Sequence, residues 1–413
     1  QYEGIARCNT SLTYIPPVPC DSVMSESLKQ RLLGEAYFLR AYYYFRLVRT
    51  YGGVPLTLSI ENDDSQWKRA RSSAEVIYAQ IISDLEQAET RLWNKSKTGG
   101  ADLGRATKGA AQAMLLKVHM YMHDYQKAKE WGDKFLTDQA SEYRLVSDFA
   151  SNFTIAGENN EESIFEIQYA NEATSDYGSG NGSTRGTFTQ VLTRSRSTNM
   201  GDEGWGFNKP THNLYNEYED ADSIRRDATI ILLDSAHLGD QDTYLGTSYL
   251  NRKTGLYNAE GTGYTYKNAH NTRGVLNNKQ YRLADFYLLY AEACLATGDE
   301  TTATTYLNVV RTRVGLPTYP GYSFKINGEE IASPTLQEAI RHERRMELAM
   351  EGHRWYDLCR WGVAAEVMTA YMALESAEAK AEMQPFKKGV HELLPIPNKQ
   401  RQLNSLLEQN FGY

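Results

Sequence analysis

Apolar side chains in the first part of the chain recur every three or four residues, the spacing of one face of an α-helix. The first run predicts a helix over 25–51, with its apolar positions at Leu28, Leu32, Leu39, Tyr43 and Leu47. This helix is expected to end at Gly52-Gly53, where glycine can adopt the left-handed conformation of a C-cap, and Pro55 prevents it from resuming. A second helix is predicted from the capping box Ser72-x-x-Glu75. Its inner stripe consists of Ile77, Ile81, Leu85, Ala88 and Leu92.

Two further segments predict tighter helical hairpins. The first covers 108–136 with a turn at His123-Asp124, and the second covers 281–315 with a turn at 297–299. In the second hairpin Ala291 and Ala303 are twelve residues apart, a spacing of small residues that lets paired helices approach closely, as in tetratricopeptide (TPR) repeats. In the first, Ala128 fits this pattern but Leu116 does not. The segment 336–368 predicts a fourth hairpin.

The segment 171–280 interrupts the helical pattern. It is rich in Gly, Asn, Ser, Thr and Tyr, and a short predicted strand over 163–169 precedes it. Because a structureless loop of this length is implausible in a compact domain, we predict an ordered, irregular insertion. The fold expected is therefore mostly α, with TPR-like hairpins as a scaffold and a large loop-rich insertion that carries short strands. Its parts are the N-terminal hairpins (1–170), a ligand-binding insertion (171–280) and the C-terminal hairpins (281–413).

Composition narrows the possible functions. The 413 residues carry a net charge of −8, which argues against a nucleic-acid-binding surface. No apolar run approaches the roughly eighteen residues that a membrane span needs. Tyrosine is abundant, with 29 Tyr against 12 Phe, and its apolar face and polar tip suit ligand clefts. The four cysteines show neither metal nor redox spacing: Cys294 and Cys359 are expected to be buried thiols, while pairing of Cys8 with Cys20 stays open.

The segment 341–362, RHERRMELAMEGHRWYDLCRWG, is densely charged. Its acids and arginines recur at helical spacing, so we interpret it as a structural network in which ion pairs link neighbouring turns. His342-Glu343 begins like a zinc-protease motif, but Met346 stands where the second histidine is required.

No other metal site is predicted. His119 and His123 lack an evident third ligand. The aspartates that might offer oxygens to calcium lack the glycine turn and terminal glutamate of a calcium loop; they are Asp220, Asp222, Asp240 and Asp242. We also find no nucleophile elbow, P-loop, dinucleotide fingerprint or Cys/His arrangement, so we expect neither catalysis nor a cofactor.

The charged segment and the chain's last residues, LLPIPNKQRQLNSLLEQNFGY, closely resemble the C-terminal signature of the SusD/RagB family. Further pieces of the resemblance occur in order: YGGVPL at 51–56, SIFEIQ at 163–168, GWG at 204–206 and AEA at 291–293. Members of that family are surface nutrient-binding lipoproteins of Bacteroidetes. The resemblance implies a helical-repeat frame, a ligand cleft in an irregular second lobe, and delivery of the ligand to a SusC-like TonB-dependent outer-membrane transporter.

The resemblance also implies a location at the cell surface, on the outer membrane, through a lipid anchor that this chain does not contain. The first residues, QYEGIARCNT, are similar to a region well downstream of the N-terminus of family members. We therefore expect a leader, a lipidated cysteine and an N-terminal segment to precede them in the full protein.

Aromatic residues in Gly- and Asn-rich surroundings are the candidate ligand-binding residues. Sugar rings present C–H patches that lie on aromatic faces, and sugar hydroxyls need amide, carboxylate or guanidinium partners. Tyr264 and Tyr266 are expected to share one face of an extended strand. The full candidate set is Trp67, Trp205, Asn208, Tyr249, Tyr257, Tyr264 and Tyr266. We predict passive capture of an oligosaccharide or polysaccharide.

Three alternatives stay open. The same fold could bind peptides, as the RagB branch of the family suggests. A TPR-type protein–protein scaffold would use the faces of its hairpins instead of the insertion. A glycoside hydrolase would need two carboxylates at a separation that only the fold can set.

Overall fold

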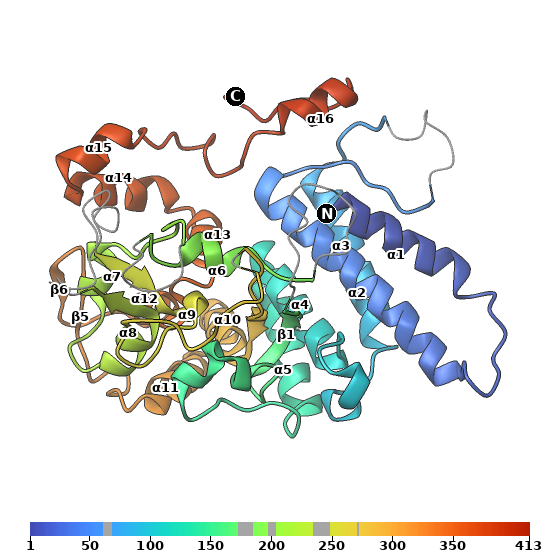
Figure 1. Ribbon diagram of the computed structural model, residues 1–413, viewed down its shortest axis with the longest axis horizontal. Helices are drawn as coiled ribbons and strands as arrows, with labels where there is room; N and C mark the ends of the chain where they lie inside the picture. The colour runs from blue at the N-terminus through green and yellow to red at the C-terminus, as the bar shows by residue number, and fades with distance from the viewer. Residues whose placement is uncertain (61–67, 172–184, 197–203, 234–247, 271) are drawn as a thin grey trace. The chain divides into compact units, whose positions relative to one another are not determined.

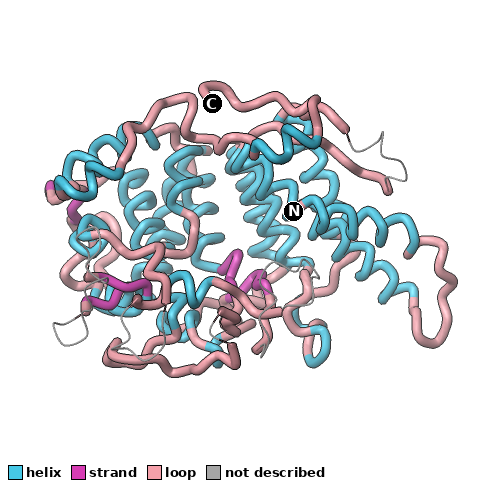
Figure 2. Tube along the Cα trace, turned by 45° about the horizontal axis from the view of Figure 1, so that its top comes forward, coloured by secondary structure: helices cyan, strands magenta, loops and turns pink. Residues whose placement is uncertain are grey.

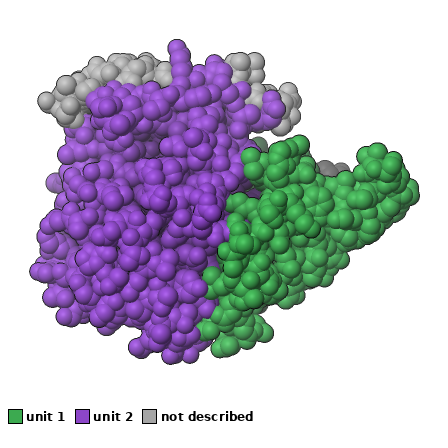
Figure 3. All heavy atoms as spheres, turned by 90° about the horizontal axis from the view of Figure 1, so that it is seen from below, with its two compact units in different colours: residues 1–142, 359–365, 386–413 green, residues 143–358, 366–385 purple. Residues whose placement is uncertain are grey.

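The computed structural model describes residues 1–60, 68–171, 185–196, 204–233, 248–270 and 272–413. Over these residues the chain forms sixteen α-helices and three two-stranded sheets, which confirms the prediction of a mostly helical fold with short strands (Figure 1). The chain divides into two compact units (Figure 3). Unit 1 comprises 1–142, 359–365 and 386–413, and unit 2 comprises 143–358 and 366–385.

Unit 1 is built from the predicted N-terminal hairpins. Its first long helix is capped by the Ser25 hydroxyl and ends at Gly52, which has φ 71°. In the next helix the predicted inner stripe is confirmed, since Ile77, Ile81 and Leu85 are completely buried. The cap of that helix is Ser73, however, and not Ser72, whose backbone bonds to Val54 instead. The helices are α1 (Tyr2–Tyr14), α2 (Glu26–Tyr51), α3 (Ala74–Glu89), α4 (Lys108–Tyr121), α5 (Tyr125–Asp138) and α16 (Asn398–Leu403), with short 3-10 turns η2 (Lys95–Lys97) and η3 (Gly100–Asp102).

Arg71 joins two of the sequence motifs in unit 1. Its guanidinium donates to the backbone oxygens of Tyr51 and Gly53 at 2.9 and 2.6 Å, and to Asn410 Oδ1 at 2.6 Å. Asn410 in turn donates to the oxygens of Tyr51 and Leu394. The YGGVPL and NFGY segments are therefore parts of one structural junction, although about 350 residues separate them in the sequence.

Unit 2 contains the remaining hairpins and all three small sheets (Figure 2). The predicted strand over 163–169 is present as β1 (Ser163–Ile167), and it pairs antiparallel with β4 (Asn278–Arg282). The predicted second hairpin is present as α10 (Leu283–Ala296) and α11 (Glu300–Arg313), with Ala291 and Ala303 completely buried. The other strand pairs are β2 (Ile230–Leu232) with β3 (Tyr249–Asn251), and β5 (Phe324–Ile326) with β6 (Glu329–Ile331).

The segment predicted as a fourth hairpin contains three helices. They are α12 (Leu336–Leu348), α13 (Arg354–Arg360) and α14 (Ala364–Leu374), and α15 (Ala377–Glu382) follows. A capping box begins α12, where the Thr335 side chain and that of Glu338 each bond to the other's backbone.

The insertion is irregular but ordered where it is described. Tyr264 and Tyr266 do not share a strand, because only Tyr264 forms a single bridge, to Tyr257. Short elements lie within and before this segment: η4 (Phe149–Phe153), η5 (Ile155–Gly157), α6 (Thr189–Thr193), α7 (His212–Glu217), α8 (Ser223–Thr229) and α9 (Arg252–Gly255).

A buried ion network lies at the centre of unit 2. Glu347 on α12 accepts from Arg313 Nη2 at 2.5 Å, from Arg225 Nη1 at 3.2 Å, and also from Arg282. Neighbouring Glu343 bonds to Arg225 and Arg311. These side chains are at most 4% exposed, so each charge depends on its partners for the stabilisation that water no longer provides.

The partners of α12 differ from those expected from helical spacing. Arg344 bonds to Asp285 on α10 and to Asp357 on α13, and Arg345 bonds to Glu217 on α7. The prediction that these ion pairs link neighbouring turns was therefore wrong: they connect α12 to other elements of unit 2. Residue spacing cannot distinguish the two cases, because it does not show which side of a helix is buried.

Candidate functional site

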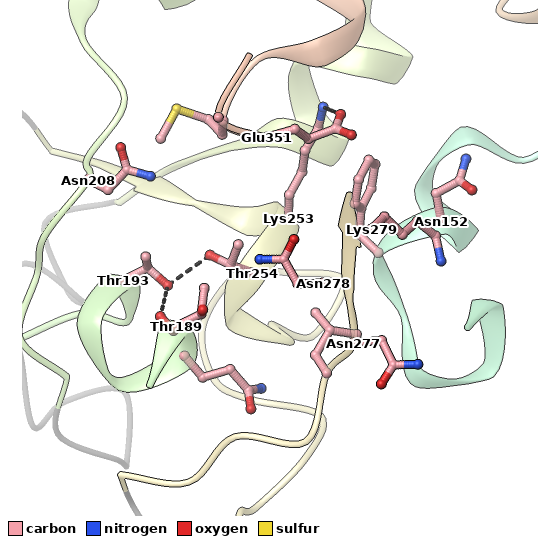
Figure 4. A pocket seen from close by; sticks show the side chains of 15 residues that line it. Asn152, Thr189, Thr193, Asn208, Lys253, Thr254, Asn277, Asn278, Lys279 and Glu351 are labelled. Atoms are coloured by element: carbon pink, nitrogen blue, oxygen red, sulfur yellow. Dashed lines mark hydrogen bonds and ion pairs between the residues drawn. The ribbon is translucent and has the colours of Figure 1, made fainter. Parts of the chain in front are cut away.

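A pocket of about 240 Å³ lies within unit 2, where six parts of its sequence converge (Figure 4). It is bordered by η4, α6, α9 and β4, by Asn208 and by the loop that follows α12. Figure 4 shows Asn208 on one side of the pocket and Lys279 with Asn152 on the other. Most side chains that reach it are amides and hydroxyls, including Thr189, Thr193, Asn208, Thr254, Asn277 and Asn278.

The segment 204–208 is attached to the end of α6. Four consecutive backbone N–H groups, from Gly204 to Phe207, donate to carbonyl oxygens between 191 and 195 at 2.7 to 3.0 Å. A Cβ on Gly204 would lie 2.3 Å from the Arg194 oxygen, and Gly206 has φ +66°, so both positions require glycine. The glycines of GWG are therefore structural, and they fix the position of the residue between them.

This segment presents two aromatic rings to solvent. Trp205 is 37% exposed and Phe207 is 56% exposed, and their ring centroids lie 6.3 Å apart at 89°. Asn208 follows directly with φ 52° and contributes to the wall of the pocket. Two exposed rings thus lie next in sequence to a polar pocket, a combination typical of carbohydrate sites.

Hydroxyl and amide groups form the pocket floor. Thr193 Oγ1 lies 2.8 Å from Thr254 Oγ1 and donates to the backbone oxygen of Thr189 (Figure 4). Asn277 is fully occupied in holding β4 to β1, with bonds to Glu166 and to the Tyr169 backbone among others. Asn278 Oδ1 accepts from Gln280, while no hydrogen bond from its Nδ2 to another described residue is present.

The charged groups that border the pocket are paired within the protein. Lys253 Nζ donates to Glu351 Oε1 at 2.8 Å, and burial lowers the pKa of Lys253 to about 8. Burial opposes the charge of Glu351, but Arg282 and Lys253 outweigh it and hold the pKa of Glu351 at about 2. Lys279 bonds to Glu166 and to the Gly157 oxygen.

The backbone is strained at the pocket wall. Met350, on the loop after α12, has φ 67°, a conformation that is unusual for a long side chain. Such residues persist where the surrounding structure fixes them, and they are common at ligand sites. Here the preceding Leu348 and Ala349 are buried, and Glu351 is fixed by Arg282, so the turn is fixed on both sides.

Of the predicted ligand-binding residues, Asn208 lines the pocket, Trp205 precedes it on the same segment, and two are buried elsewhere in unit 2. Trp205 and Asn208 belong to the attached segment described above. Tyr249 is 5% exposed, stacks on Tyr215 at 4.8 Å, and its hydroxyl is bonded to His212. Tyr257 is 7% exposed and packs in an apolar cluster. Neither of these two tyrosines lines the pocket, although Tyr257 borders a second cavity of about 220 Å³.

The other three candidates have different positions. Tyr264 is half-buried, with the guanidinium of Arg194 4.0 Å above its ring. Tyr266 is half-buried and lines the same second cavity, which shares Phe153 with the pocket. Trp67 lies outside the described residues.

Sequence reasoning missed Phe207, Thr254 and Asn278. The first could have been found by extending the GWG motif by one residue, since Phe207 follows the motif directly. Thr254 and Asn278 carry no local signal: they meet because α9 and β4 fold together, although 24 residues separate them.

Unit 1 contains a larger groove, of about 1,120 Å³. Its walls are predominantly apolar, with Tyr2, Leu47, Leu403 and Leu407 among them. None of the described candidate residues from the sequence lines this groove, whereas Asn208 lines the smaller pocket, so the smaller pocket is the better candidate.

The described residues contain no group of three or more His, Cys, Asp and Glu side chains that could hold a metal ion. His119 lies 3.3 Å from Asp124, and Asp222 is paired with Arg225. Asp240 and Asp242 lie outside the described part. None of the four cysteines, all of which are described, forms a disulfide: Cys8 and Cys294 are buried, Cys359 is half-buried and Cys20 is exposed.

Comparison with known families gives two matches. A model described as "SusD family" matches 233–413, and one described as "Starch-binding associating with outer membrane" matches 1–120. A solved structure described as "Laminarin binding SusD-like protein" is 30% identical, with a TM-score of 0.78 over 100% of this chain and 84% of that one. The chain belongs to the SusD family.

Other SusD-like proteins are similar over most of this chain. A "SusD-like protein" of Bacteroides ovatus is 28% identical over 385 residues, which cover 87% of this chain and 64% of the relative. The "Surface glycan-binding protein A from Bacteroides fluxus" is 26% identical, with a TM-score of 0.81 over 100% of this chain and 84% of that one. The chain thus spans just under two thirds of the length of the Bacteroides ovatus relative. Among the described residues, no helix combines the length and apolar character needed to cross a bilayer.

Proposed function

We propose that this SusD-family chain captures oligosaccharides at the pocket of unit 2, with Trp205 and Phe207 as aromatic platforms. The observation that carries the proposal is the two exposed rings, which lie directly before Asn208 on a segment attached to the pocket wall. A sugar ring can stack on either platform while its hydroxyls exchange hydrogen bonds with Asn208, Asn278 and Thr254. The similarity to a laminarin-binding SusD-like protein supports a glycan as the ligand.

Capture requires no chemical step. The acids nearest the pocket, Glu351 and Glu166, are each bonded to a basic side chain, so neither is available as a general acid or base. We expect a bound oligosaccharide to keep its length during prolonged incubation, as measured by chromatography. Shortening of the glycan that depends on one carboxylate of unit 2 would instead establish the hydrolase alternative.

Peptides are the less suitable ligand for this pocket. A free peptide brings a charged amino group and a carboxylate, and the pocket's cations and anions are already paired with each other. A TPR-type scaffold would use hairpin faces, and substitutions at Trp205 or Phe207 would then leave binding unchanged.

The description of the family model over 1–120 supports association with the outer membrane. We propose that the protein is held there by a lipid anchor outside this chain and that it passes its glycan to a SusC-like TonB-dependent transporter. Co-purification of the full-length protein with such a transporter from outer membranes tests this part. Recovery of the protein without any transporter would contradict it.

The test of glycan capture is isothermal titration against a panel of oligosaccharides. We expect one class to bind, and Trp205→Ala to weaken that binding by about tenfold, the loss of one stacking contact. Phe411→Ala is the matched control, because Phe411 is an exposed phenylalanine of unit 1. An equal affinity for the wild-type protein and the Trp205→Ala variant would refute the proposed platform.

A further inference from the structure

We infer that the pocket of unit 2 selects neutral glycans and rejects those that carry carboxylate or sulfate groups. This inference rests on the proposed function and goes beyond it, because it names the class of glycan. It follows from the way in which each charged side chain at the pocket is already used inside the protein.

The ammonium of Lys253 is buried and makes two hydrogen bonds within the protein. Its ammonium donates to Glu351 Oε1 at 2.8 Å and to the Glu347 backbone oxygen at 3.0 Å. The rings of Phe149 and Phe153 lie 5.0 and 4.6 Å from the same nitrogen and cover it further. The side chain is 1% exposed, so an approaching carboxylate or sulfate finds the charge covered.

The other two charged groups are occupied in the same way. Lys279 is paired with Glu166, donates to the Gly157 oxygen at 3.0 Å, and its side chain is 6% exposed. Glu351 accepts from Arg282 Nε at 2.7 Å and Nη2 at 2.8 Å in addition to Lys253. Among the described residues that line the pocket, each charged side chain is therefore already paired with an opposite charge of the protein.

The groups that remain are neutral and can both donate and accept. Asn208 and Asn278 carry carboxamides, and Thr254 carries a hydroxyl. These groups match the hydroxyls of a neutral sugar. An anionic substituent would lose its hydration in the pocket without gaining a counter-charge.

Isothermal titration with matched ligands tests the inference. The neutral probes are laminarihexaose, maltohexaose and xylohexaose, and the anionic probes are sulfated laminarihexaose and hexagalacturonate. We expect the best neutral probe to bind at least about tenfold more tightly than either anionic probe. We also expect its affinity to change less than about twofold between roughly 50 and 500 mM NaCl, because no ion pair forms on binding.

The possible outcomes separate the inference from the function on which it rests. Anionic probes that bind as tightly as neutral ones, or binding that weakens strongly with salt, would overturn the inference and leave glycan capture intact. If no oligosaccharide of either kind binds, glycan capture itself is refuted and the inference falls with it.

One substitution tests the physical reason directly. Asn278→Lys introduces an uncommitted cation at the half-exposed pocket wall. We expect it to raise the affinity for sulfated laminarihexaose by at least about fivefold. Thr305→Lys is the control, because it adds the same charge at an exposed position of α11 that does not border the pocket, and its affinity should equal that of the wild type.

Thermal unfolding of both variants verifies that they are folded. Should Asn278→Lys fail to fold, Asn208→Lys carries the same test from the opposite side of the pocket. A folded pocket variant that leaves the affinity for the sulfated probe unchanged would show that missing cations are not the basis of selection, and the inference would be wrong.

Discussion

Unit 2 contains two polar regions that border each other and differ in kind. The ion network around α12 is buried and made of full charges, each satisfied by groups of the protein. The pocket beside it is open and is lined mainly by neutral amides and hydroxyls. Glu351 and Lys253 belong to both regions, and they are paired with each other. The difference supports our proposal that this protein uses its buried charges to stabilise the fold, while neutral groups and aromatic rings recognise the ligand.

Removing one charge from the network should have the largest effect. Glu347→Ala leaves three arginines without a shared carboxylate, and we expect it to lower the free energy of unfolding by about 3–5 kcal/mol. Denaturant unfolding measures this loss. The control Glu329→Ala, at an exposed position of β6, should change stability by no more than about 0.5 kcal/mol. Similar losses in the two variants would remove the distinction between buried and exposed charges.

Removing one of the two exposed rings that precede Asn208 should reduce affinity but not stability. Phe207→Ala is expected to weaken glycan binding by about three- to tenfold, because the 56% exposed ring contributes little to the core. Titration and thermal unfolding of the same sample give both quantities. Tyr264→Ala should show the reverse, since its ring packs under buried Arg194. A loss of stability in Phe207→Ala without a loss of affinity would place Phe207 in the scaffold.

The network should also make stability depend on pH. Burial lowers the pKa of His342, but the carboxylates of Glu217 and Glu219 outweigh it, so the pKa is raised above its ordinary value. Protonated His342 therefore stabilises the fold fully at a pH below the ordinary histidine pKa. This stabilisation is lost as the pH rises through the raised pKa of His342. Between the ordinary histidine pKa and the raised pKa of His342, we expect the free energy of unfolding of the wild type to fall as the pH rises. That of the His342→Gln variant should fall less, as measured by denaturant unfolding at each pH. A parallel pH dependence of the two proteins would exclude His342 as the cause.

The smallest effect is expected from one hydroxyl of the pocket. Thr254→Val keeps the shape of the side chain but removes the hydroxyl that meets Thr193, and we expect an affinity loss of about two- to fivefold. Titration against the tightest neutral probe measures it. Thr301→Val, at an exposed position of α11, is the matched control. An unchanged affinity in Thr254→Val would restrict recognition to the rings and amides.

The fold was more predictable than the site. Helical hairpins produce local periodicity, so the helices that end at Tyr51, Tyr121 and Ala296 could be located from apolar spacing alone. The cap at Ser73 was missed by one residue, because adjacent serines offer equivalent hydroxyls.

The site depends on contacts between distant residues. Tyr249 and Trp205 both stand in irregular sequence, yet one is buried against Tyr215 and the other is exposed. Only the tertiary structure shows which of the two rings is exposed. The glycines on either side of Trp205 let the segment lie close against α6, and the role of Trp205 in binding stays a prediction.

A structure of the protein bound to the tightest neutral hexasaccharide tests the central claim most directly. The account predicts a sugar ring stacked on Trp205 or Phe207, and hydroxyls within hydrogen-bond distance of Asn208, Asn278 or Thr254. A glycan bound in the apolar groove of unit 1, with the pocket of unit 2 empty, would contradict it.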